Sequence, residues 1–367
     1  MITDKNFLGY NGFIWFNGVV EDRNDPQKLG RVRVRCVGLH TQDKAVLPTT
    51  DLPWSQVILP TTSAGISGLG QSPAFLVEGT WVFGYFRDGD DCQEPMIIGT
   101  LPGVPAELAS KDKGFYDPNG IYPKYKDETD TNRLAVNGEN PHLSLELRKL
   151  SRITGIPTAD FDLVSVQDHV STEITASDGD TWNQPEIPYA AVYPLNHVIE
   201  SESGHIKEFD DTKGAERIYE AHRVGTSYEI SPDGTKTDII KGDHYNITYG
   251  KSQALIEGKS DLTIGGRHKL YINKDGAIDN HYDIQIGPNA NINIQVDKGN
   301  LNLVVKDGQF NANVGGDYNV KVGGNYNLDV RGNLTETISG TKTSNTTQAV
   351  MHRGSTFTVN ANRIDLN

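Results

Sequence analysis

The chain has 367 residues, of which 36% are hydrophobic and 38 are glycine, and its formal net charge is −14. Phosphate backbones and anionic lipids repel such an acidic surface, so the composition argues against nucleic-acid binding and simple membrane adsorption. No apolar run reaches the length of a transmembrane helix, and no secretion signal is evident. The two cysteines, Cys36 and Cys92, are expected to be free thiols.

Residues 1–105 alternate and turn like a small β-domain. The segment GRVRVRCVG (30–38) has the period of a strand, and EGTWVFGYF (78–86) is apolar on both faces, which predicts a central strand. The segment MIIGTLPG (96–103) returns after a turn. About five short strands of this kind favour a closed OB-fold barrel.

Three arginines alternate along the first of these strands. Arg31, Arg33 and Arg35 lie opposite the apolar residues, because successive side chains of a strand point to opposite faces. OB barrels bind oligonucleotides in many proteins, but a fold does not imply a function, and this chain is acidic. We interpret the three arginines as a solvated strand face or a protein contact, with no nucleic-acid partner.

Residues 106–182 are predicted to be a linker with little regular structure. They are rich in turn formers, and one short helix is expected at 141–152. A glycosidase needs two carboxylates held across a cleft, and nothing in this pattern indicates a folded cleft. We therefore interpret four acidic residues as solvated linker charges: Glu139, Glu146, Asp160 and Asp162.

The chain changes character at residue 183. Residues 183–233 are predicted to lead into a repeat through short strands at HVIES (197–201), HIKEFDD (205–211), ERIYEAH (216–222) and SYEISPDG (227–234). These strands alternate apolar and polar residues between turn formers.

Residues 234–367 repeat with a period of eight. Tyr318, Val320 and Val322 lie on one side of an octad and polar residues on the other, which predicts a strand of about six residues with one buried face. Glycine is expected at each corner because it tolerates positive φ. The glycines that mark the period are Gly234, Gly242, Gly250, Gly258, Gly266, Gly308, Gly316, Gly324, Gly332 and Gly340.

The spacing between the two glycine series predicts one irregularity. The 42 residues from Gly266 to Gly308 equal five octads plus two residues, and 287–291 (GPNAN) is the expected place of the slip. A two-residue slip keeps strand parity, so the inward face stays inward.

A strand and a corner every eight residues wind a chain into a β-helix. Each octad offers only two or three apolar residues to the axis, which is a thin core for one chain. We therefore expect three chains to intertwine as a homotrimeric, triple-stranded β-helix, so the fold class predicted for the whole chain is all-β. Such a shaft is narrow and has few loops in which to build a pocket.

Several segments resemble the central spike proteins of T-even-type phage tail baseplates and, more distantly, the valine–glycine repeat spikes of type VI secretion. They are the octad array, residues 193–218 (YPLNHVIESESGHIKEFDDTKGAERI), residues 18–40 (GVVEDRNDPQKLGRVRVRCVGLH) and residues 52–86. The resemblance implies a homotrimer whose OB domains sit on a baseplate hub protein beneath the tail tube. It also implies a virion protein whose shaft pierces the host outer membrane when the sheath contracts.

The founding member of that family carries a lysozyme domain between the OB domain and the β-helix, whereas the linker here is shorter than a usual domain. We therefore expect no catalysis and no cofactor. Two alternatives remain: an effector-delivering spike of a type VI secretion system or phage-tail-like particle, and a β-helical polysaccharide-degrading enzyme. The second is less favoured, because the outward positions of the octads are regular and mostly Asn, Lys, Thr and Asp.

The end of the chain carries the last site predictions. The resemblance implies a small cone-shaped tip protein with proline–alanine–alanine–arginine repeats, and Ile364 and Leu366 are predicted to contact it. Some phage spikes hold iron through paired His-x-His ligands, but this chain has no such pair, and His352 is interpreted as solvent-facing. No metal site is therefore expected.

Overall fold

A computed structural model describes residues 12–136, 173–183, 185, 188–223, 226–272 and 281–364. Its regular elements in these ranges are β-strands and short 3-10 turns, so the predicted all-β class is confirmed. The helix expected at 141–152 and the four linker carboxylates lie outside the described residues. No helix in the described ranges is long and apolar enough to cross a membrane. The chain divides into two compact units, residues 1–270 and 271–367.

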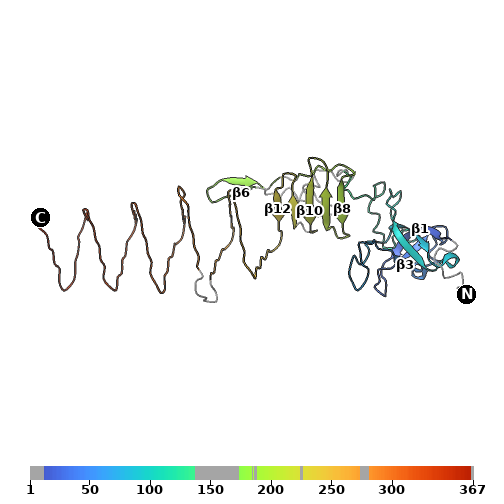
Figure 1. Cartoon of the computed structure of the whole chain (residues 1–367), viewed down its shortest axis with the longest axis horizontal. Helices are drawn as coiled ribbons and strands as arrows, with labels where there is room; N and C mark the ends of the chain where they lie inside the picture. Colours follow the sequence, from blue (N-terminus) through green and yellow to red (C-terminus); the bar gives the residue numbers. More distant parts are fainter. Residues whose placement is uncertain are drawn as a thin grey trace. The chain divides into compact units, whose positions relative to one another are not determined.

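Five strands near the N-terminus close into a barrel (Figure 1). The order around the barrel is β1-β2-β3-β5-β4, and β4 pairs antiparallel with both β1 and β5, which confirms the predicted central strand. The barrel therefore matches the OB fold expected from the sequence. Its strands are β1 (Ile14–Asp22), β2 (Val32–Cys36), β3 (Trp54–Val57), β4 (Trp81–Phe86) and β5 (Pro95–Thr100).

Inward side chains from these strands fill the barrel. Phe16 and Val20 of β1, Val34 of β2, Val82 of β4 and Ile97 of β5 are all buried in one cluster. Their positions follow the two-residue period of the strands, and burying each apolar side chain contributes roughly 1.5–3 kcal/mol. The alternation of Val32, Val34 and Cys36 in the sequence thus marked the core-facing side of β2.

Arg35 corrects the interpretation of the arginines as a solvated face. Its side chain is fully buried, with Nε 2.7 Å from Oε1 of Glu21. The guanidinium also donates to the carbonyl oxygens of Thr41 and Leu47, at 2.6 and 2.8 Å. The strand period places Arg35 outward, but the loop that follows β2 folds over it. The arginine is therefore internal to the domain.

The other two arginines of this strand also have partners within the chain. Arg31 donates to Asp25 at 2.7 Å, and the guanidinium of Arg33 lies 4.4 Å from the centre of the Trp54 ring. Because Arg31, Arg33 and Arg35 all contact residues of their own chain, few of their guanidinium donors are left for an external ligand.

Residues 106–136, the described start of the predicted linker, have no strand or helix but are anchored at both ends. The Phe115 amide donates to Oε1 of Glu21 at 2.7 Å, which ties this segment to the barrel. Farther along, the Leu134 carbonyl accepts hydrogen bonds from Tyr189 and Asn196 at 2.6 and 2.9 Å. The segment is therefore packed structure between two sheets rather than a free tether.

A hairpin and a five-stranded antiparallel sheet follow (Figure 1). The hairpin consists of β6 (Glu173–Thr175) and β7 (Thr181–Asn183), within the predicted linker. The sheet has the order β12-β11-β10-β9-β8, and it confirms the short strands expected before the repeat. Its strands are β8 (Asn196–Glu200), β9 (Ile206–Asp210), β10 (Arg217–Ala221), β11 (Ser227–Ile230) and β12 (Lys236–Ile239).

The two faces of this sheet have an unusual polarity. The buried face holds an ion network, in which Arg217 lies 2.8 Å from Glu208 and 3.0 Å from Glu229. The opposite face exposes apolar side chains, including Phe209 and its cross-strand partner Ile218. A soluble single-chain sheet normally places these groups the other way round.

Candidate functional site

The repeat is an extended chain that bends at regular intervals (Figure 1). Every described residue in 240–272 and 281–364 is exposed, and none of them belongs to a strand ladder. The backbone bends at all ten glycines that mark the octads: Gly234, Gly242, Gly250, Gly258, Gly266, Gly308, Gly316, Gly324, Gly332 and Gly340. Their role as corners of an intertwined trimer stays a prediction.

The backbone φ angles show how many of these ten positions need the conformational freedom of glycine. Among the ten, only Gly234 and Gly308 have positive φ, at 84° and 127°. The expectation that corner glycines rely on positive φ is therefore wrong for the other eight. A Cβ built on Gly324, for example, meets no atom of its own chain within 4 Å. Within one chain, nothing at that position requires glycine.

The irregular middle of the repeat extends beyond 287–291. Asn289 bends the chain there with φ of 64°, at the predicted place. However, Gly299 and Gly308 are nine residues apart and both have positive φ. The unit between these two glycines is therefore one residue longer than the regular period of eight.

One side of the repeat carries a regular row of apolar side chains. Tyr318, Val320 and Val322 are 74%, 59% and 46% exposed, and the next octad repeats the pattern. Single exposed apolar residues are normal, but contiguous rows of this length mark interaction surfaces.

Only one of the two predicted tip contacts lies in the part of the chain that the structure describes. Ile364 is 52% exposed at the end of the described chain, and Leu366 lies outside the described residues. His352 is exposed and stacks on Phe357, with ring centres 5.3 Å apart. Within the described ranges, no group of three or more His, Cys, Asp or Glu side chains is placed to hold a metal.

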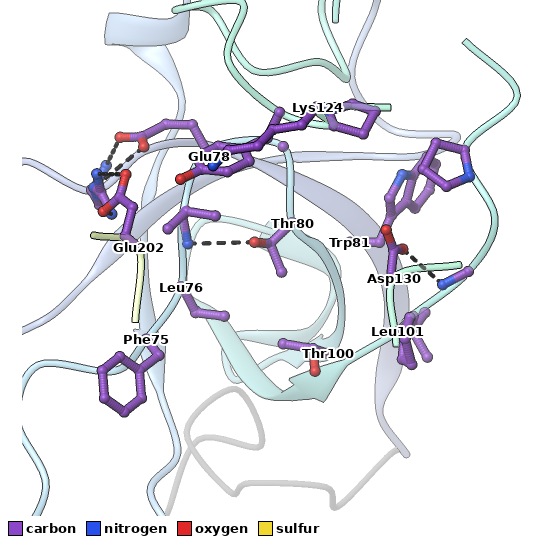
Figure 2. Close-up of a pocket in the computed structure, with 18 of the residues that line it drawn as sticks. Phe75, Leu76, Glu78, Thr80, Trp81, Thr100, Leu101, Lys124, Asp130 and Glu202 are labelled. Atoms are coloured by element: carbon purple, nitrogen blue, oxygen red, sulfur yellow. Dashed lines mark hydrogen bonds and ion pairs between the residues drawn. The ribbon is translucent and has the colours of Figure 1, made fainter. Parts of the chain in front are cut away.

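A second candidate site is an open crevice beside the barrel, with a volume of about 1720 Å³. Figure 2 shows Phe75, Glu78 and Glu202 on one side of the crevice and Trp81 and Leu101 on the other. The loop before β4, the segment after β5 and the end of β8 supply the lining. Sequence reasoning missed this crevice, because its walls come from segments far apart in the chain.

Most charges in the crevice have partners inside the chain. Arg23 lies 2.8 Å from Glu202 and 3.3 Å from Glu78, and Asp130 accepts a hydrogen bond from the Gly103 amide at 2.8 Å. Bonding to Arg23 lowers the pKa of Glu202 and raises that of the arginine. The ion pairs of Arg23 and the hydrogen bond to Asp130 thus brace the walls of the crevice.

A third candidate surface is aromatic and lies outside the barrel on β1 and β4. Phe13 and Trp15 are 39% and 51% exposed. Trp15 stacks on Phe83 at 5.3 Å, and Phe13 meets the edge of Tyr85 at 4.8 Å. The sequence signal for this surface is that aromatic residues occupy alternate outward positions on both paired strands.

The barrel and the bending octads together define a class of protein, an OB-fold domain joined to a glycine-octad β-segment. Residues 38–182 match the family described as Gp5 N-terminal OB domain, and three copies of the Gp5 C-terminal repeat match within residues 316–339. Residues 38–182 are thus similar to the Gp5 OB-domain family and residues 316–339 to the Gp5 C-terminal repeat family, in line with the resemblance found in the sequence.

Two phage proteins are similar to this chain. Protein Gp5 of Vibrio phage KVP40 is 39% identical over 280 residues, which are 72% of this chain and 66% of that protein. Pre-baseplate central spike protein Gp5 of Enterobacteria phage T4 is 26% identical over 469 residues, which are 73% of this chain and 81% of that protein. The chain thus spans just under two thirds of the length of the first relative.

Proposed function

We propose that this protein is the structural central spike of a contractile phage tail baseplate. Three copies intertwine through their octads into a β-helical shaft, which punctures the host outer membrane when the sheath contracts. The name of the T4 relative, a pre-baseplate central spike protein, supports this role. The protein then assembles in the host cytoplasm, resides in the virion tail baseplate, and reaches the periplasm only during infection.

The observation that carries the proposal is that every described residue of the repeat after β12 is exposed within one chain. Well over 90% of buried backbone N–H and C=O groups are paired in native proteins, and an extended chain can pair them only with neighbouring strands. Among the described residues, the octads after β12 have no such neighbour, and their apolar row has no cover. Two further copies of the same chain supply both, at every level of the shaft.

The sheet β8–β12 supports the same arrangement. Phe209 and Ile218 are exposed, whereas Arg217 and Glu208 are buried against the chain's own segments. If the apolar face of each copy turns toward a three-fold axis, the apolar side chains are removed from water and the polarity becomes ordinary. The trimer would then begin before the first octad.

The aromatic surface on β1 and β4 suits docking to the baseplate hub protein beneath the tail tube. Tryptophan and tyrosine are enriched at the centres of protein interfaces. Trp15 and Tyr85, whose rings lie 5.7 Å apart, are the residues that we expect to contact the hub.

We propose that the chain has no catalytic activity of its own. The alignment with the T4 relative covers 469 positions, whereas 73% of this chain is about 268 residues. Roughly 200 of the aligned positions therefore have no counterpart here, which is the size of a domain. Wall digestion is then the task of another protein.

We propose that a tip protein covers the last described part of the repeat, where Ile364 is 52% exposed. Ile364 and Leu366 would contact a small cone-shaped tip protein with proline–alanine–alanine–arginine repeats. Covering such an end also protects the last strands from pairing with other chains.

The decisive experiment is the native mass of the full chain by light scattering, beside an unheated denaturing gel. One chain has a mass of 40.3 kDa. We expect a mass close to that of three chains, and a band that resists detergent until it is boiled, because the interwoven backbones must unwind together. A single-chain mass would overturn the intertwined shaft.

A further inference from the structure

The connection between β3 and β4 carries a small structured projection, residues 60–72, here called the finger. The Ser63 amide donates to the Pro60 carbonyl at 2.8 Å, and the Gln71 amide donates to Oγ of Ser63 at 2.7 Å. At the tip, Gly65 and Leu69 are joined by a backbone hydrogen bond of 3.1 Å. The finger is thus held in shape before it meets any partner, which lowers the entropic cost of binding.

The tip of the finger is apolar. Ile66 and Leu69 face each other across an antiparallel bridge, and each is 66% exposed. Exposed loop tips are usually polar. Moreover, residues 52–77 contain no Asp, Glu, Lys, Arg or His, although 22% of the chain is charged. Nothing in one chain explains an uncharged, ordered, apolar projection.

The crevice beside the barrel has matching properties. Phe75, Leu101 and Val104 line it and are 83%, 42% and 64% exposed. Its volume of about 1720 Å³ exceeds the roughly 300–1,000 Å³ of small-molecule sites, so it suits a polypeptide segment. The finger of the same chain leaves Ile66 and Leu69 in solvent, so it does not fill the crevice of its own barrel.

The charge of the crevice wall determines which part of a second copy can bind in the crevice. Six carboxylates and four basic side chains line the crevice, so its wall is negative. A second copy is itself acidic, with a net charge of −14, and most of its surface is repelled there. The uncharged stretch 52–77 escapes this repulsion, and the finger is its projecting part.

We propose that the finger of one copy inserts Ile66 and Leu69 into the crevice of a second copy. The finger and the crevice are different surfaces of one chain, so the contact between two copies is heterologous. Three such contacts close into a ring of barrels. The ring rests on the trimer proposed above, and it adds a contact between barrels that the octads do not provide.

The test is site-directed crosslinking of the full chain with a short bismaleimide. The variant Ile66→Cys/Val104→Cys is expected to give covalent ladders of two and three chains on a reducing gel. Each single variant is expected to give no ladder of three. The matched control Val46→Cys/Val104→Cys moves the first thiol to another exposed apolar position outside the finger, and it should stay unlinked.

The possible results distinguish failure of the finger contact from failure of the intertwined trimer. Absence of the ladder in a sample whose mass equals three chains overturns the finger contact and leaves the trimer standing. A faster-migrating single chain would mean that finger and crevice meet within one copy, which also overturns the contact. A sample with single-chain mass overturns both proposals.

A second measurement does not depend on thiol geometry. Ile66→Asp places a charge at the tip of the finger and should speed amide exchange at Leu101, Gly103 and Val104 of the assembled protein by about tenfold or more, the scale of a lost interface anchor. Val46→Asp adds the same charge elsewhere and should leave that exchange unchanged. Equal effects of the two variants would contradict the contact.

Discussion

Glu21 and Arg35 form a fully buried ion pair that holds three segments together: the barrel wall, the loop after β2 and the start of residues 106–136. Replacing Glu21 with Gln leaves the arginine buried without its counter-charge. Removing one partner of such a pair costs roughly 3–5 kcal/mol. We expect amide exchange in β1 and β2 to accelerate by about two orders of magnitude in Glu21→Gln.

The matched control is Glu94→Gln, which breaks a pair with Arg87 whose side chains are about half exposed. Exposed pairs contribute about 0–1 kcal/mol, so exchange in the same strands should hardly change. Equal acceleration in both variants would mean that burial does not set the strength of the Glu21–Arg35 pair.

Asp25 makes the stability of the turn after β1 depend on pH. The Arg31 side chain donates to both carboxylate oxygens, and the Gln27 and Leu29 amides donate as well, so the pKa of Asp25 lies well below its usual range. A carboxyl with a lowered pKa stabilises the fold above its unfolded-state value of about 4, and this contribution is lost as the pH falls further.

We therefore expect Asp25→Asn to lower the melting temperature of the barrel at pH 7. The further drop between pH 5 and pH 3 should be smaller in the variant than in the unaltered chain, because the variant has already lost the titrating group. An identical acid-dependent drop in both would show that Asp25 is not responsible for it.

At the scale of elements, two corner glycines make a useful comparison. Gly308 has φ of 127°, which strains any side chain, whereas Gly324 has ordinary φ and open space around a Cβ in its own chain. Gly308→Val should cost about 1–3 kcal/mol per chain from the backbone alone. Gly324→Val should lower the melting temperature only if neighbouring copies crowd that corner.

Thermal melting of both variants, beside Asn325→Val as a neighbouring non-glycine control, checks this comparison. A drop in Gly324→Val that exceeds the control identifies interchain packing at the corner. An unchanged profile would count against the corner assignment.

Local pattern found the barrel strands and the bends of the repeat, but it missed the β6–β7 hairpin in the predicted linker. The alternation around Val34 and Val82 predicted barrel strands, and the glycine period predicted the bends, because both depend on residues close in sequence. The burial of Arg35 could not be read in this way, because it depends on how the loop after β2 folds back over the strand. The anchoring of Leu134 could not be read either, because its partner Tyr189 lies far along the chain. The uncharged run that contains Ile66 was visible in the sequence, but its shape was not.

At the scale of the whole molecule, the number of chains around the axis determines the length of the shaft. If each copy contributes one strand per level, roughly fifteen octads stacked at about 4.8 Å give a shaft of about 70 Å. If a single chain wound three strands around each level, the same octads would reach only about a third of that length.

Electron microscopy of the full chain and of a chain ending at Gly299 distinguishes these two cases. In the trimer, removing the last 68 residues removes about eight levels, so the shaft should shorten by roughly 40 Å. In a single-chain helix the shortening would be only about 13 Å. The larger change would also explain how a thin acidic chain becomes a stiff needle: every added octad lengthens the shaft, because each level draws its core from three chains.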